Sequence, residues 1–121
     1  MRTVSLRIPV SLAFAFIATQ VFAHAQLEKS APAVGGTVAS ASEIRLTFSE
    51  GVEPRFSGVT LTSPGGANVP LGQPKVEGSD QRVLIAPITN ALTAGAYTVH
   101  WHAVSVDTHH TQGTFKFTVK P

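Results

Sequence analysis

The chain contains no cysteine. Disulfide bonds, thiolate metal sites and cysteine nucleophiles are therefore excluded, and the fold must depend on its packed core. Methionine is nearly absent as well, because Met1 is the only one among the 121 residues. Met1 is thus the only residue that could supply a thioether ligand. The length predicts one domain, and about 100 residues are enough for an independent core.

No apolar run is long enough to span a bilayer. The longest, residues 8–18, is far shorter than the roughly 20 residues that a membrane helix requires. It follows Arg2 and Arg7 and precedes small residues, which is the pattern of a secretory signal. We therefore expect residues 1–23 to be a cleaved signal peptide and residues 24–121 to form the exported domain.

A basic block is also missing. The expected signal peptide holds two of the nine Lys and Arg residues and none of the seven Asp and Glu residues, so the remaining chain has no formal net charge apart from its termini and histidines. The seven remaining basic residues are scattered. The high isoelectric point of the whole chain therefore does not indicate a nucleic-acid partner.

Helical periodicity is absent beyond residue 23. Apolar and polar residues instead alternate in short runs, which predict strands with one buried face. The runs are 43–48, 58–63, 82–87 (more continuously apolar), 96–104 and 114–119. Turns rich in Gly and Pro separate them. About seven short strands predict an all-β fold, an antiparallel β-sandwich with an immunoglobulin-like Greek key.

The five histidines fall in two places. His24 is alone, whereas His100, His102, His109 and His110 lie within eleven residues. On a strand, His100 and His102 would face away from the apolar side that carries Trp101. These two histidines are either surface residues or support a site, and the pattern leaves both readings open.

Asp107 and His109 are two residues apart. In an extended segment both side chains would project to the same side. A carboxylate beside an imidazole can bind a metal, can orient a general base, or can simply cap a turn with the aspartate. Hydrolytic and phosphate-binding chemistry receive no support, because the chain has no G-x-S-x-G elbow and no glycine-rich loop between a strand and a helix.

The order of motifs along the chain resembles the CopC family of small periplasmic copper-binding proteins of bacteria. The motifs are His24-Ala25, Ser30-Ala31-Pro32, LTFSE at 46–50, LTAGAYTVHW at 92–101 and S-x-D-T-H-x-x-x-G at 105–113. The first and last of these are the most specific. The resemblance implies a β-sandwich, export to the periplasm and one Cu(II) ion per chain.

By position, the resemblance assigns the copper ligands to His24, Asp107 and His109. His24 would bind through its α-amino nitrogen and its imidazole, and Glu50 aligns with an acidic residue near the family's site. Three nitrogens and one oxygen suit Cu(II). The implied function is a copper carrier or buffer in copper homeostasis or resistance, a monomer without enzymatic activity. An inner-membrane copper transporter is a candidate partner.

The chain departs from some family members in one respect. Those members carry a second, methionine-rich Cu(I) site, but the corresponding stretch here, residues 63–74, has no Met and no His. We therefore expect a single Cu(II) site and no Cu(I) site. His100, His102 and His110 also stand at positions where the resemblance assigns no ligand.

Two other functions remain open on the sequence. An N-terminal histidine with a second histidine on copper also resembles the histidine brace of oxidative enzymes that cleave polysaccharides, although those domains are larger. A domain without metal, acting as an immunoglobulin-like adhesion or assembly module, would instead use an exposed edge strand.

The point of signal cleavage decides whether His24 is present to bind a metal ion. Cleavage after Ala23 leaves His24 at the mature terminus, and cleavage after Ala25 removes it. Both satisfy the small-residue rule. The distant Asp107 and His109 and the resemblance together favour cleavage after Ala23.

Overall fold

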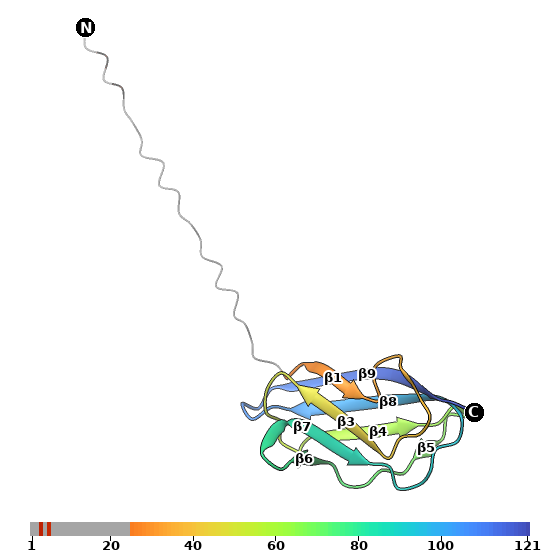
Figure 1. The fold of residues 1–121 in the computed structure, drawn as a ribbon. Coiled ribbons are helices and arrows are strands. Elements are labelled where there is room, and N and C mark those ends of the chain that lie inside the picture. The colour runs from red at the N-terminus through yellow and green to blue at the C-terminus, as the bar shows by residue number, and fades with distance from the viewer. Residues whose placement is uncertain (1–2, 4, 6–24) are drawn as a thin grey trace.

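The alternating runs form strands, as their period predicts. The computed structural model describes residues 3, 5 and 25–121, and this part of the chain contains nine strands and no helix (Figure 1). They are β1 (Leu27–Ala31), β2 (Thr37–Val38), β3 (Glu43–Phe48), β4 (Gly58–Thr62), β5 (Asn68–Val69), β6 (Lys75–Glu77), β7 (Asp80–Pro87), β8 (Gly95–Val104) and β9 (His110–Val119).

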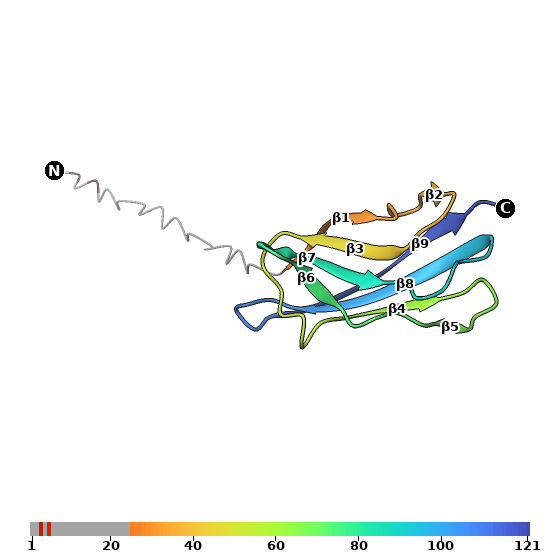
Figure 2. The ribbon, with the colours of Figure 1, turned by 60° about the horizontal axis from the view of Figure 1, so that its bottom comes forward.

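The strands form two sheets that pack face to face. One sheet has the order β1-β3-β7-β6 and the other has the order β2-β9-β8-β4-β5. Figure 2 shows the two layers from the side. The predicted β-sandwich is therefore confirmed. One pairing departs from the antiparallel prediction, because the two residues of β2 run parallel to the end of β9.

The core is built from the inward faces of the two sheets. On β8, Tyr97 and Trp101 are buried, and Tyr97 stands opposite Phe117 of β9 with the ring centroids 5.6 Å apart. Phe48, at the end of β3, meets the Trp101 ring edge-on with the ring centroids 5.2 Å apart. Aromatic pairs of this kind add to the burial of apolar area. The second contact joins one sheet to the other.

Gly113 of β9 leaves room for Trp101. The two residues pair across β8 and β9, and a Cβ atom at position 113 would lie 2.6 Å from Cζ2 of the indole. We expect Gly113→Ala to lower the free energy of unfolding by about 1–3 kcal/mol, because the buried ring must move. Denaturant unfolding measures this.

Gly78→Ala is the matched control. A Cβ atom at position 78 would meet nothing within 4 Å. The control should change the free energy of unfolding by less than about 0.5 kcal/mol. Equal stabilities of the two variants would contradict the close packing of Trp101 on Gly113.

Three segments that are distant in the sequence meet at one end of the sandwich. The loop between β8 and β9 contacts the segment after β3, because Val106 N donates to the carbonyl of Gly51 at 3.0 Å and Ser105 forms a β-bridge with Val52. The residues before β1 join them, since Ser49 N donates to the carbonyl of Gln26 at 2.8 Å. This end of the fold contains the candidate site.

Across residues 25–121, no helix is long and apolar enough to cross a membrane.

Candidate metal site

The loop that joins β8 to β9 is a tight turn. The Ser105 N–H donates to the carbonyl of His109 at 2.9 Å, and the Thr108 N–H donates to the carbonyl of Ser105 at 2.8 Å. Thr108 has a φ of 74°, in the left-handed region that β-branched residues rarely occupy. The expectation of an extended segment at 107–109 is therefore wrong, and the turn itself brings the side chains of Asp107 and His109 together.

Asp107 and His109 lie side by side at the tip of the hairpin. Nδ1 of His109 lies 3.1 Å from Oδ2 of Asp107, and both side chains are about two-fifths exposed. The other carboxylate oxygen, Oδ1, accepts a hydrogen bond from the hydroxyl of Ser105. The Ser105 hydroxyl and the His109 ring together lower the pKa of Asp107 to about 2. The carboxylate is therefore ionised at neutral pH.

The contact with Asp107 also orients the His109 ring. In a neutral His109 ring that keeps its proton on Nδ1, beside the carboxylate, Nε2 carries the lone pair that a metal ion would use. Metal-binding histidines commonly keep their second nitrogen on a carboxylate in this way. The same carboxylate can also supply an oxygen ligand. The pair therefore offers one nitrogen and one oxygen donor, and both roles of Asp107 fit the geometry.

The beginning of the described chain is fastened beside this loop. The carbonyl of Ala25 accepts a hydrogen bond from Oγ1 of Thr111 at 2.8 Å, two residues beyond His109. The Gln26 N–H donates to Oγ of Ser49 at 2.9 Å. Ala25 itself is fully buried and belongs to the core. The predicted ligand His24 lies outside the described residues.

Glu50 directly follows Ser49 at this end of the fold. Its Oε1 atom is buried and has no hydrogen-bond partner within the described part of the chain. A buried oxygen without a partner fits the predicted position near a metal. Among residues 25–121, however, no group of three His, Asp or Glu side chains is arranged to hold a metal ion. The described structure thus assembles Asp107 and His109 and does not add Glu50 as a third member.

The remaining histidines do not join this pair. Nδ1 of His100 lies 3.1 Å from Oγ1 of Thr114 on β9. The His102 ring instead lies over Gly58 on β4, where a Cβ atom would come within 2.5 Å of its Cε1 atom. The two exposed rings therefore lean to opposite sides of β8. His110 is exposed at the start of β9.

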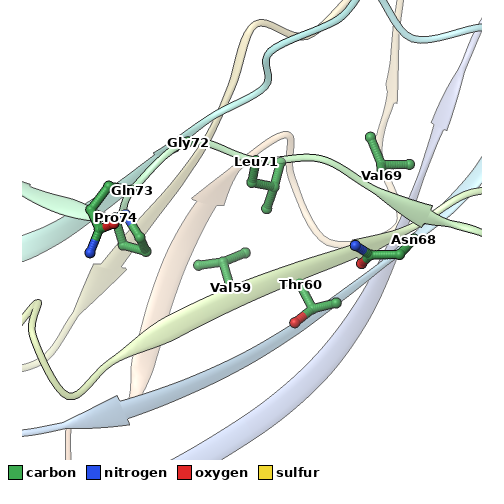
Figure 3. A pocket seen from close by; sticks show the side chains of 8 residues that line it. All are labelled: Val59, Thr60, Asn68, Val69, Leu71, Gly72, Gln73 and Pro74. Atoms are coloured by element: carbon green, nitrogen blue, oxygen red, sulfur yellow. The ribbon is translucent and has the colours of Figure 1, made fainter.

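A hollow between β4 and the segment that follows β5 lies apart from the Asp107–His109 pair and lacks metal-binding side chains. It has a volume of about 300 Å³ and is shown in Figure 3. Its lining residues are Val59, Thr60, Asn68, Val69, Leu71, Gly72, Gln73 and Pro74. No histidine or carboxylate lines it, so it provides none of the donors expected for the metal site.

The sequence did not reveal the hydroxyl groups that hold the site together. Ser105 contacts Asp107 and His109, while Ser49 and Thr111 fasten the residues before β1. In the sequence, Ser49 and Ser105 belong to the LTFSE and S-x-D-T-H motifs, but nothing there indicates which groups they contact. A general signal was present in the S-x-D-T-H motif, because serine side chains often form hydrogen bonds with nearby backbone groups.

Comparison with known proteins identifies the relatives of this fold. A family model described as the CopC domain matches residues 27–120. Protein YobA of Escherichia coli K12 is 43% identical over 110 residues, covering 90% of this chain and 89% of YobA.

Two crystal structures are also similar. CopC from Methylosinus trichosporium OB3b matches with a TM-score of 0.75 and 30% identity, covering 81% of this chain and 95% of that chain. PcoC, described as a methionine-rich copper resistance protein from Escherichia coli, matches with a TM-score of 0.69 and 37% identity, covering 81% of this chain and all of that one.

Proposed function

This chain belongs to the CopC family, and on that premise we propose that it is a periplasmic carrier or buffer that binds one Cu(II) ion. The observation that carries the proposal is the Asp107–His109 pair, held 3.1 Å apart beside the anchored beginning of the domain. Its role would lie in copper homeostasis or resistance.

The anchoring of Ala25 supports His24 as the third ligand. Consecutive Cα atoms are 3.8 Å apart, so a residue bonded to Ala25 starts from the end of the sandwich that holds His109. A mature terminal His24 would supply its α-amine and imidazole as a chelate. Together with His109 and Asp107, this makes three nitrogens and one oxygen, a donor set suited to Cu(II).

The burial of Ala25 also bears on the cleavage point. A chain that began at Gln26 would lack a core residue and the carbonyl that Thr111 binds. We therefore expect the exported protein to begin at His24. Intact-mass measurement and N-terminal sequencing check this. A mature chain beginning at Gln26 would lack the proposed chelate and would contradict a copper site that includes His24.

Metal titration of the mature protein tests the function itself. We expect one equivalent of Cu(II) with a nitrogen-rich EPR spectrum. Cu(I) should find no tight site, because the chain has no cysteine and its only methionine, Met1, belongs to the expected signal peptide. Tight, stoichiometric binding of Cu(I) in a competition titration would show that a site of another kind exists.

A carrier is favoured over a copper-dependent oxidative enzyme. The ionised carboxylate of Asp107 lies against His109, where such an enzyme would keep a copper position open for oxygen. We propose accordingly that the protein is a monomeric, non-enzymatic carrier with an inner-membrane copper transporter as its candidate partner.

A further inference from the structure

We propose that Ser105 is a positioning residue whose single hydroxyl sets the geometry of both Asp107 and His109 for metal binding. This inference deepens the proposed function and rests on it. In the sequence, Ser105 is only the first residue of the S-x-D-T-H motif, and the pattern gives it no function. It would act without being a copper ligand itself.

The contacts of the Ser105 side chain reach both members of the pair. Its Oγ donates to Oδ1 of Asp107 and accepts a hydrogen bond from the His109 N–H at 3.2 Å. A hydroxyl has one proton and two lone pairs, so it can make these two bonds at the same time. One oxygen atom therefore connects the carboxylate of one predicted ligand to the backbone of the other.

The surroundings hold this hydroxyl in place. Ser105 is fully buried, and its backbone is fixed by the β-bridge to Val52 and by the bond from its N–H to the carbonyl of His109. The ligand side chains, in contrast, are about two-fifths exposed. Ser105 is thus the fixed part of the site, and the exposed donor residues are hydrogen-bonded to it.

The engagement of Oδ1 has a consequence for the other carboxylate oxygen. With Oδ1 bound to Ser105, Asp107 presents Oδ2 to Nδ1 of His109. Removing the hydroxyl would free the carboxylate to rotate and would release the His109 N–H. The turn would then have to keep Thr108 at its positive φ without this support. Supporting partners of metal ligands typically affect metal affinity by 10- to 100-fold.

Ser57, which directly precedes β4, provides a matched control. It is also buried, and its Oγ accepts a hydrogen bond from the Val104 N–H at 3.0 Å. Ser57→Ala and Ser105→Ala each delete one buried hydroxyl bonded to the end of β8 or the loop after it. Only Ser105 contacts Asp107 and His109 directly. A general loss of stability should therefore affect the two variants alike.

The experiment compares Cu(II) affinity, the EPR spectrum and the ¹⁵N NMR shifts of the His109 ring in metal-free protein. Ser105→Ala should bind Cu(II) about 10- to 100-fold more weakly than the wild type, with an altered EPR spectrum and altered ring shifts. Ser57→Ala should match the wild type in all three measurements. Ser105→Thr should bind Cu(II) within about a few-fold of the wild type, because a threonine hydroxyl offers the same donor and acceptors as a serine hydroxyl.

The outcomes separate this inference from the proposed function. If Ser105→Ala behaves like Ser57→Ala, or if Ser105→Thr binds as weakly as Ser105→Ala, the hydroxyl does not position the pair. If the wild type binds no Cu(II), the proposed function fails. The ring shifts of metal-free protein then decide the inference alone, because unchanged His109 signals in Ser105→Ala would overturn it.

Discussion

A single extra residue in front of His24 is expected to weaken Cu(II) binding by more than about 100-fold. This loss exceeds the roughly 10- to 100-fold that is typical when a residue supporting a metal ligand is removed. The extension converts the α-amine into an amide and breaks the proposed chelate with the imidazole. His24→Ala removes the imidazole instead and should be similarly severe. Isothermal titration with a competing chelator measures both changes.

The control for this experiment places the same extra residue after Pro121. Pro121 is exposed and lies two residues beyond the end of β9. The extension there should leave the affinity for Cu(II) unchanged. If the protein extended before His24 binds Cu(II) as tightly as this control, the α-amine is not a ligand.

Replacement of His109 by alanine should have an effect of the same size. His109→Ala removes a nitrogen donor and the partner of the Asp107 carboxylate, so Cu(II) affinity should fall by more than about 100-fold, above the range for indirect partners. Equilibrium titration followed by EPR measures the loss. Histidine ligands must also be deprotonated, so binding in the unmodified protein should weaken as the pH falls below the ordinary histidine range.

His110→Ala is the matched control, because it removes the adjacent imidazole. His110 is exposed at the start of β9 and makes no contact with Asp107 among those described. Its loss should change the affinity by no more than a few-fold. Equal losses in the His109 and His110 variants would show that the cluster binds copper through exposed histidines in general.

The buried faces of the long strands could be predicted from the sequence because a half-buried strand has a period of two. Alternation placed Tyr97 and Trp101 of β8 inside, and both are buried. The same pattern could not reveal β2 and β5, since each has only two residues. Two residues cannot display a period of two.

The candidate pair could also be found from the sequence, but the way its members meet could not. Spacing alone suggested that Asp107 and His109 lie on one side of an extended segment. They meet instead in a turn with Thr108 at a φ of 74°. A threonine has little local preference for that conformation, so the turn depends on the buried Ser105 and on the segment after β3.

The role of Ala25 shows a second limit of sequence reasoning. The small-residue rule treats Ala25 only as an alternative to Ala23 at the cleavage point. Its burial arises because Thr111 and Ser49, distant in the sequence, close around the residues before β1. A contact between such separated segments leaves no local pattern to read.

The most direct test of the proposed Cu(II) site is a crystal structure of the exported protein with one equivalent of Cu(II), in which anomalous scattering locates the metal. The ion should lie at the end of the sandwich, bound by the α-amine and imidazole of His24, by His109 and by Asp107. A single copper ion bound instead by His100 or His102 on the outer face of β8, with Asp107 and His109 still paired to each other, would contradict the account.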